Sequence, residues 1–411
     1  MKPLSEFDFF DPAVAEDPYA FYDALRREAP VHPVPGLGFF LVTRYADVVQ
    51  ALRQPERFSS RFGQAMQARM GGPRKELLDV WSRGWMPVDT LLTNDPPSHT
   101  RFRGLVSKAF SARRVATIEP RVRKIAGDLV DGFLGSGRID LVSGFAVPLP
   151  LTVIADQLGV PREDLPRFKK WSDDSVAPLG QMISPERELE CTESIVEFQH
   201  YFAGKLDERR AAPKDDLLSD LVQATIEGER PLDTGEMLSI LQQLLVAGNE
   251  TTTNLIGSAM LLLLRHPDQM ARVRKDPSLV PNLVEEALRL EAPVQGMWRV
   301  AVEDAEIGGV AVPKGSFLML RYGAANRDEA QFPDPDRFDV GRENARTHLS
   351  FGLGIHFCVG AALARKEALI DFETLLPRLR NVRLAEGRSP RHVPSILLRG
   401  LEELVIEFEP A

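Results

Sequence analysis

The chain has 411 residues, of which 44% are hydrophobic and 27% are charged, and its formal net charge is −9 at pH 7. These values are ordinary for a globular protein. The acidic balance argues against a nucleic-acid partner, because nucleic-acid-binding proteins usually carry a basic face. The sequence begins MKPLSEFDFFDP, without a basic-then-apolar signal, and its longest apolar run is about half of a bilayer span. We therefore expect a cytoplasmic monomer without a membrane segment, and one domain over residues 1–411.

Helical patterns dominate the first two thirds of the chain. Residues 19–28 are amphipathic and end before Pro30. Residues 39–42 (FFLV) predict a short strand, and residues 45–53 predict a helix after it. Further helices are expected at residues 98–110, 115–136 and 186–210. Short strands are expected later, at residues 300–302, 305–307, 311–312 and 317–320, and in a C-terminal hairpin of residues 396–398 and 403–408.

The stretch from residue 234 to residue 264 predicts a long helix. Asp233 and Glu236 form a plausible capping box, and Pro267 ends the pattern. Apolar residues occur almost all round, which predicts burial. The middle nevertheless reads VAGNETTTN (residues 246–254), and such a polar interruption in a buried helix is typical of a functional site.

Cysteine is rare, since only Cys191 and Cys358 occur, and no CxxC pair suggests zinc or an iron–sulfur cluster. Cys358 lies in Phe-Gly-Leu-Gly-Ile-His-Phe-Cys-Val-Gly (residues 351–360), just before a helix-like run. Glycines allow a tight turn and the close approach of a large group. Amides at a helix N-terminus stabilise thiolate, so Cys358 is a candidate ligand of haem iron.

This run resembles the haem-binding signature of the cytochrome P-450 family, and the resemblance covers essentially the whole chain. Glu286 and Arg289 resemble the family's ExxR motif, and Arg337 resembles the third member of its buried ion-pair network. The resemblance implies a mainly α fold, a triangular prism of helices around haem with a minor β-rich side. It also implies haem b as cofactor, dioxygen as co-substrate and electrons that derive from NAD(P)H.

Haem contacts follow from the same resemblance. His99 and Arg103 lie four residues apart, on one helical face, where both could bind haem carboxylates. Arg299 and His356 match two further anchoring cations. The resemblance also places haem beside these four residues: Phe351, Gly352, Ala247 and Gly248.

The polar interruption resembles the family's acid–alcohol pair, here Glu250 and Thr251. Two protons must reach dioxygen so that one oxygen atom leaves as water. A hydroxyl can hold the oxygen and a carboxyl can relay protons through water. Many members carry aspartate where this chain has Glu250, and both side chains are ionisable. Gly248 and a threonine hydroxyl bonded back to a carbonyl are expected to kink the helix.

A hydrophobic substrate is expected, and the reaction is hydroxylation, demethylation or epoxidation. The resemblance places the pocket at the loop of residues 62–92 and at six named positions: Gln243, Val246, Val294, Met297, Ser395 and Ile396. Electrons are expected from a separate ferredoxin or flavodoxin. A basic surface would attract such an acidic partner, and the candidates are Lys108, Arg113, Arg114, Arg342, Arg346, Arg365 and Lys366.

Two other hypotheses keep Cys358 but change the chemistry. A peroxygenase or isomerase would not need Glu250 and Thr251, so its activity would survive replacement of Thr251. A haem sensor or carrier would bind haem without turnover. The sequence alone does not name the substrate or the site of attack.

Overall fold

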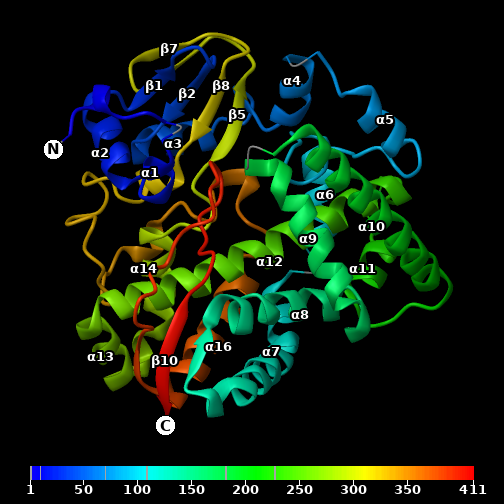
Figure 1. The fold of residues 1–411 in the computed structure, drawn as a ribbon. Helices are drawn as coiled ribbons and strands as arrows, with labels where there is room; N and C mark the ends of the chain where they lie inside the picture. Colours follow the sequence, from blue (N-terminus) through cyan, green and yellow to red (C-terminus); the bar gives the residue numbers. More distant parts are fainter. Residues whose placement is uncertain (1, 10, 70, 108–109, 181–182, 226–227) are drawn as a thin grey trace. The chain divides into compact units, whose positions relative to one another are not determined.

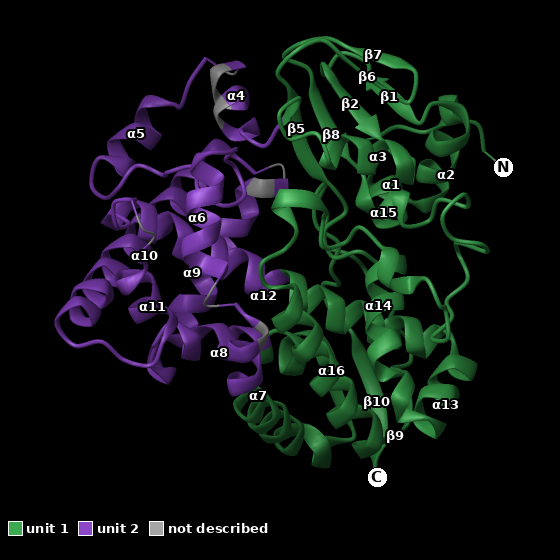
Figure 2. Cartoon of the chain, turned by 180° about the vertical axis from the view of Figure 1, so that it is seen from behind, with its two compact units in different colours: residues 1–58, 119–149, 251–411 green, residues 59–118, 150–250 purple. Residues whose placement is uncertain are grey.

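The computed structural model describes residues 2–9, 11–69, 71–107, 110–180, 183–225 and 228–411. Helices form most of these residues, as predicted. The chain divides into two compact units, residues 1–58, 119–149 and 251–411 in unit 1 and residues 59–118 and 150–250 in unit 2 (Figure 2). Among the described residues, no helix is both long and apolar enough to cross a membrane.

A five-stranded sheet with the strand order β1-β2-β8-β5-β3 lies at the N-terminal end of unit 1 (Figure 1). β2 runs parallel to β8, whereas β1 pairs with β2 and β5 with β8 in antiparallel fashion. Helix α3 packs against this sheet, since its Val48 and Leu52 join Val42 and Leu320 in one buried cluster. The bounds are Val31–Val34 (β1), Phe39–Val42 (β2), Tyr45–Leu52 (α3), Phe58–Ser59 (β3), Met297–Ala301 (β5) and Phe317–Leu320 (β8).

Two smaller sheets complete the strands of the described chain. In the first, β10 pairs with both β4 and β9, and in the second β6 pairs with β7 through a Gly308-Gly309 turn whose φ angles are +56° and +79°. The predicted C-terminal hairpin is wrong, because β10 pairs with β9 instead of residues 396–398. Alternation alone does not name a strand's partner. The bounds are Arg138–Asp140 (β4), Ala305–Ile307 (β6), Val310–Val312 (β7), Leu379–Leu384 (β9) and Val405–Pro410 (β10).

The helices of unit 1 include the predicted first amphipathic helix, which is confirmed as α2. The chain leaves α2 at Ala29, directly before Pro30, as a residue preceding proline disfavours helix. The bounds of the α-helices are Pro12–Glu16 (α1), Tyr19–Glu28 (α2), Pro267–Lys275 (α13), Val280–Leu290 (α14), Tyr322–Ala325 (α15) and Ala361–Arg378 (α16). Single 3₁₀ turns are Leu4–Glu6, Leu134–Ser136, Pro277–Leu279, Ala345–Thr347 and Gly354–His356, and Val142–Ala146 is a π-helix.

Unit 2 is helical, and aromatic side chains on α9 and α10 form its core. Trp171 and Phe202 are fully buried, and their ring centroids lie 6.3 Å apart. Helices at about the predicted places confirm three expectations, namely α6, α7 and α10. The bounds are Phe62–Arg69 (α4), Lys75–Trp81 (α5), Ser98–Ser107 (α6), Ala112–Phe133 (α7), Pro148–Gln157 (α8), Arg162–Asp164 (a 3₁₀ turn), Leu165–Gly180 (α9), Pro185–Ala211 (α10) and Leu217–Gln223 (α11), of which α7 and α8 run across the boundary into unit 1.

Helix α12, Thr234–Arg265, is the longest of the described helices and runs across the same boundary. Its capping box is confirmed, since the Glu236 amide donates to Asp233 Oδ1 at 2.9 Å and the Asp233 amide donates to Glu236 Oε2 at 2.9 Å. The helix is continuous through its polar middle. One threonine bonds outside the helix, because the Thr253 hydroxyl donates to the Ala146 carbonyl at 3.0 Å.

Candidate functional site

The loop before α16 holds Cys358 in a turn that glycine makes possible. Gly352 and Gly354 have φ angles of +68° and +72°, in the left-handed region. A Cβ on Gly354 would lie 2.9 Å from the Leu52 carbonyl oxygen, so no larger residue fits there. The Cys358 amide donates to the Phe351 carbonyl at 2.8 Å and closes the turn. The thiol therefore has a fixed place at the start of α16.

The residues of this loop fit haem. Cys358 forms no disulfide and is half-buried, and a Cβ on Gly360 would lie only 4.0 Å from its sulfur. Large apolar side chains beside it stay accessible, with Ile355 at 37% and Phe357 at 39% exposed. A thiolate, an accessible apolar surface and small neighbours are the donor set and the space that a haem requires.

Unit 1 also supplies two of the predicted anchoring cations. Arg299 lies on β5 and is 4% exposed, and its Nη1 donates to the Trp298 carbonyl at 2.7 Å. His356 is half-buried and ends the single turn before Cys358. Haem carboxylates are anions that a buried guanidinium can bind through charge-assisted hydrogen bonds.

The other two predicted anchors lie in unit 2, on α6. His99 is 2% exposed, and Arg103 is half-buried one helical turn later. Burial and the nearby Arg103 charge lower the pKa of His99, and Asp95 partly opposes this. His99 is therefore a neutral hydrogen-bond donor at neutral pH, and Arg103 carries the charge.

The predicted oxygen-side residues form an accessible stripe along α12. Ala247 is exposed, and Gln243, Glu250 and Thr251 are half-buried, while their neighbour Asn249 is 1% exposed. Positions three and four apart share a helical face, so these side chains line one edge of the helix. The expectation that the whole helix is buried is therefore wrong at its middle.

The opposite face of that polar stretch is bonded into the protein. Asn249 Nδ2 donates to the Ser172 hydroxyl at 2.9 Å within unit 2. Thr252 is 2% exposed and its hydroxyl hydrogen-bonds to Glu367 of α16 within unit 1. The polar residues thus serve two purposes, since one face anchors the helix and the other remains accessible.

The importance of two buried carboxyl groups in α16 was not predicted from the sequence. Glu367 and Asp371 lie one turn apart and are 2% and 0% exposed. Among the described residues no group hydrogen-bonds to either carboxylate oxygen of Asp371. Burial raises the pKa of Glu367 to about 8, against the Thr252 hydrogen bond, and burial and Glu367 raise the pKa of Asp371. The signal was present in the sequence as two acids four apart in the apolar run EALIDF.

Glu286 and Arg289 of the ExxR motif form a buried ion pair, but the third member of this network is Arg342 and not the predicted Arg337. Arg289 Nε donates to Glu286 Oε2 at 2.7 Å, and both side chains are fully buried. Arg342 completes the network, 3.0 Å from Glu286 Oε1 and 8% exposed. The backbone carbonyl of the predicted Arg337 accepts a hydrogen bond from Arg289, but the Arg337 side chain is 63% exposed and lies beside Asp339. Both arginines lie in the same irregular segment, so sequence order did not distinguish them.

A second charge network supports the cysteine loop from α14. Glu285 is 2.7 Å from Arg365 Nε and 3.1 Å from His348 Nε2. The Arg365 guanidinium carbon lies 4.4 Å from the centroid of the Phe351 ring, and the His348 ring lies 5.7 Å from it on centroids. Phe351 is thereby held between two charged or polar side chains.

Two of the predicted pocket segments meet in unit 1. Val294 forms a β-bridge with Leu398, and the Gln295 amide donates to the Leu397 carbonyl at 2.7 Å. This pairing brings together predicted pocket residues that are all half-buried, namely Val294, Met297, Ser395 and Ile396. In unit 2, Gln243 Oε1 accepts the Leu92 amide at 3.1 Å and ties the predicted loop of residues 62–92 to α12. Val246, also in unit 2, is half-buried.

Of the predicted basic surface, Arg113 and Arg346 are exposed, and the Arg346 side chain is 72% exposed. Arg342 is excluded by its burial in the ExxR network. Three others are partly covered by acids: Arg114 with Asp215, Arg365 with Glu285 and Lys366 with Glu119. Lys108 lies outside the described residues.

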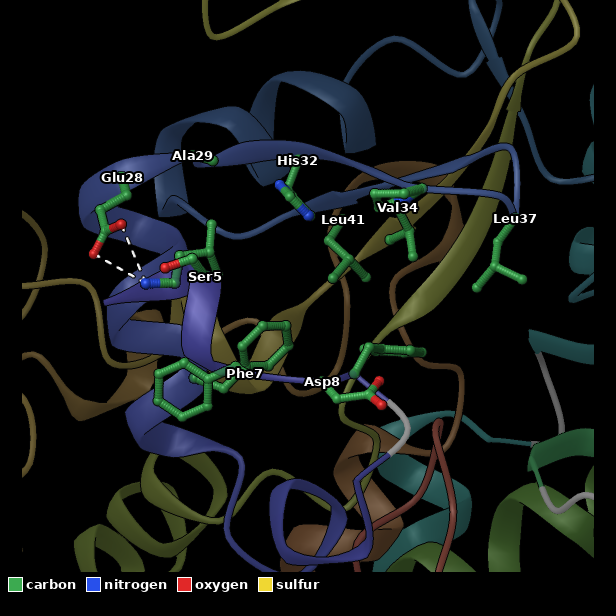
Figure 3. A pocket seen from close by; sticks show the side chains of 13 residues that line it. Ser5, Phe7, Asp8, Glu28, Ala29, His32, Val34, Leu37 and Leu41 are labelled. Atoms are coloured by element: carbon green, nitrogen blue, oxygen red, sulfur yellow. Dashed lines mark hydrogen bonds between the residues drawn. The ribbon is translucent and has the colours of Figure 1, made fainter. Parts of the chain in front are cut away.

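A hollow described in the structure lies elsewhere, at the N-terminal segment (Figure 3). It encloses about 740 Å³ between Phe7 and Asp8 on one side and His32 and Leu41 on the other. Glu28 at its edge accepts the Leu4 amide at 3.3 and 3.2 Å. None of the predicted site residues lines it, so it is not the candidate site.

The fold and the cysteine loop together define a haem-thiolate protein. A family model described as cytochrome P450 matches residues 183–398. Cytochrome P450 107B1 of Saccharopolyspora erythraea is 43% identical over 97% of this chain and 96% of its own length. The 6-deoxyerythronolide B hydroxylase of the same organism is 40% identical over 96% of both chains. The solved structure of CYP109Q5 from Chondromyces apiculatus has a TM-score of 0.86 at 42% identity and covers 97% of both chains.

The chain belongs to the cytochrome P450 family. It is a haem-dependent monooxygenase, and haem b, dioxygen and NAD(P)H-derived electrons are its cofactor and co-substrates. The mainly α fold expected from the sequence is confirmed.

Proposed function

We propose that this chain hydroxylates a large, mostly apolar small molecule, of the macrolactone or steroid class, as a single 1–411 domain acting as a cytoplasmic monomer. Its relatives support the substrate class. One is named a 6-deoxyerythronolide B hydroxylase, and CYP109E1 from Bacillus megaterium, 33% identical with a TM-score of 0.83 over 95% of this chain and 99% of its own, was solved with testosterone. The mostly apolar and half-buried pocket residues of unit 1 agree with such a ligand.

Cys358 is the residue that would ligate the haem iron, and His99, Arg103, Arg299 and His356 are the residues that would bind its carboxylates. When bound, the haem supplies the activation of dioxygen. Ala247 and Gly248 of α12, and Phe351 and Gly352 of the cysteine loop, are the further residues that would contact the haem, and three of them have side chains small enough for its close approach.

The observation that carries this proposal is the accessible stripe on α12. Glu250 and Thr251 are adjacent and half-buried in α12, whose Asn249 and Thr253 hydrogen-bond to Ser172 and to the Ala146 carbonyl. We assign the Thr251 hydroxyl to hold and donate a proton to dioxygen, and the Glu250 carboxyl to exchange protons with water. General acid–base work of this kind contributes about 10²–10⁴-fold in rate.

The electron donor is proposed to be a small acidic ferredoxin or flavodoxin. The exposed Arg113 and Arg346 are the candidate contacts among the described basic residues. Charge of this type at the rim of an interface acts mainly on the rate of association, and salt weakens it.

The test of thiolate ligation is the absorbance spectrum of the reduced protein under carbon monoxide. We expect a strongly red-shifted Soret band in the wild type and in Cys191→Ser, which changes the buried cysteine of α10. Cys358→Ser should lose that band. A red-shifted band that survives in Cys358→Ser would refute the assignment.

The test of substrate class uses the ferric protein. Macrolactones, steroids, fatty acids and small aromatics are added in turn, and a shift of the Soret band to the blue marks a compound that displaces water from the iron. Blue shifts confined to small aromatics would contradict the proposed class. A compound that binds is then assayed for hydroxylated product with a ferredoxin and its reductase.

A further inference from the structure

Arg321 is a buried arginine in unit 1 without a carboxylate partner among the described residues. It follows β8, and it is 4% exposed. Nη1 donates to the Ile396 carbonyl at 2.6 Å and contacts Met319 Sδ at 3.0 Å, and Nη2 donates to the Tyr22 hydroxyl oxygen. Nε has no acceptor among the described residues. Every partner of this cation is therefore neutral.

Two other buried arginines of the same unit have acidic partners. Arg289 pairs with Glu286, and Arg399 Nε lies 2.6 Å from Glu291 Oε2. A buried ion costs several kcal/mol unless a counter-charge lies beside it. Burial lowers the pKa of Arg321 to about 9, so it stays charged at neutral pH and lacks that compensation.

A small cavity adjoins this guanidinium. Its volume is about 40 Å³, and its lining includes two further basic side chains, Arg399 and His392, with Tyr22 and Gln295 as polar neighbours. Arg399 is balanced by Glu291, and none of the described lining residues is acidic. A water-sized species needs roughly 10–15 Å³ of such volume, so the cavity admits a small ion and excludes a bulky one.

We propose that this cavity binds a small monovalent anion of halide size, held by Arg321. The anion accepts the hydrogen bond of Nε and neutralises the buried charge. Since Nη1 also holds the Ile396 carbonyl, the ion secures the segment that pairs with Val294. This site goes beyond the proposed function, and its lining shares Ser395 and Ile396 with the proposed substrate pocket.

Crystals of the haem-loaded protein grown with bromide in place of chloride test the site directly. Anomalous scattering at the bromine edge should show a peak beside Arg321 in the wild type and none there in Arg321→Met. A cavity without a peak in the wild type, or a peak that persists in Arg321→Met, would overturn the proposal. The wild-type crystal alone decides the matter if the variant does not fold.

Thermal unfolding of the haem-loaded protein in solution gives a second readout. At constant ionic strength, with gluconate replaced by chloride, the midpoint of the wild type should rise by about 1–2 °C for each tenfold increase in chloride above its dissociation constant. Arg321→Met should lose this dependence. Arg26→Met is the matched control, because Arg26 is also buried but lies near Asp23 and Glu329. The midpoint of this variant should still rise with chloride. Equal chloride dependence in wild type and Arg321→Met would contradict the inference.

Discussion

The buried carboxyl of Glu367 should make the stability of this protein depend on pH, and Glu367→Gln should remove the contribution of this group to that dependence. The glutamine keeps the shape and can still accept from Thr252. The ordinary pKa of 4.5 applies to the unfolded chain, and burial raises the pKa in the folded chain to about 8. Between these values the unfolded chain loses its proton and the folded chain keeps it. The folded state is therefore increasingly disfavoured as pH rises through this window.

The magnitude follows from the two pKa values. Between pH 6 and pH 8 the wild type should lose about 2 kcal/mol of unfolding free energy through this group, slightly below the limiting slope of about 1.4 kcal/mol per pH unit. An unfolding entropy of about 2 cal/mol/K per residue converts this to a midpoint change of roughly 2–3 °C for a chain of this size. Glu367→Gln should thus gain about 2–3 °C on the wild type between pH 6 and pH 8.

The assay is thermal unfolding of the haem-loaded protein at one scan rate, at pH 6, 7 and 8. Glu373→Gln is the control, since Glu373 lies on the same helix but pairs with Arg123 at 2.8 Å and is 37% exposed. The infrared carbonyl band of protonated acids should also lose intensity in Glu367→Gln, while the buried Asp371 still contributes to it. A midpoint difference between wild type and Glu367→Gln that is the same at all three pH values would refute the reasoning.

Three further predictions concern the site and its support. Arg342→Met should lower the free energy of unfolding by about 2–4 kcal/mol, because it removes one cation from the buried Glu286. Arg337→Met should lower it by under about 1 kcal/mol, as measured by denaturant unfolding. Equal losses in the two variants would show that Arg337 does belong to the network. Thr251→Ala should lower product formed per NAD(P)H consumed by about tenfold or more, while Thr253→Ser, which keeps its hydroxyl, should not; full coupling in Thr251→Ala would favour the peroxygenase or isomerase hypothesis. Arg346→Glu should raise the KM for ferredoxin several-fold at low salt and less at high salt, and Arg383→Glu, an arginine 65% exposed on β9, is its control; a salt-independent effect would place the partner elsewhere.

Local rules accounted for much of the fold. Helix α2 ends shortly before Pro30, and α12 ends shortly before Pro267. The capping box of Asp233 and Glu236 starts α12, as predicted. These features depend on residues near in sequence, so local chemistry decides them. Partner choice over long distances does not follow from such rules. The alternation of β10 was visible, but only the fold shows that it pairs with β9 and β4.

The candidate site shows the same division. The sequence placed Cys358 in a tight glycine turn, and the positive φ angles of Gly352 and Gly354 agree with it. It named Arg337 where the structure has Arg342, because burial of one guanidinium depends on how an irregular segment folds. Nor did it find Glu367 and Asp371, whose importance comes from complete burial and not from residue type.

The contacts of Glu285 with His348 and Arg365, next to Phe351, indicate that contacts within the protein fix the position of the cysteine loop. Burial opposes the ionisation of Glu285, but hydrogen bonds from His348 and Arg365 overcome it and lower the pKa to about 2. Glu285 is thus ionised at neutral pH. It holds Arg365 over Phe351, whose carbonyl accepts the Cys358 amide. The position of the sulfur therefore rests on contacts from α14 and α16, and a ligand held in advance loses little entropy when it binds.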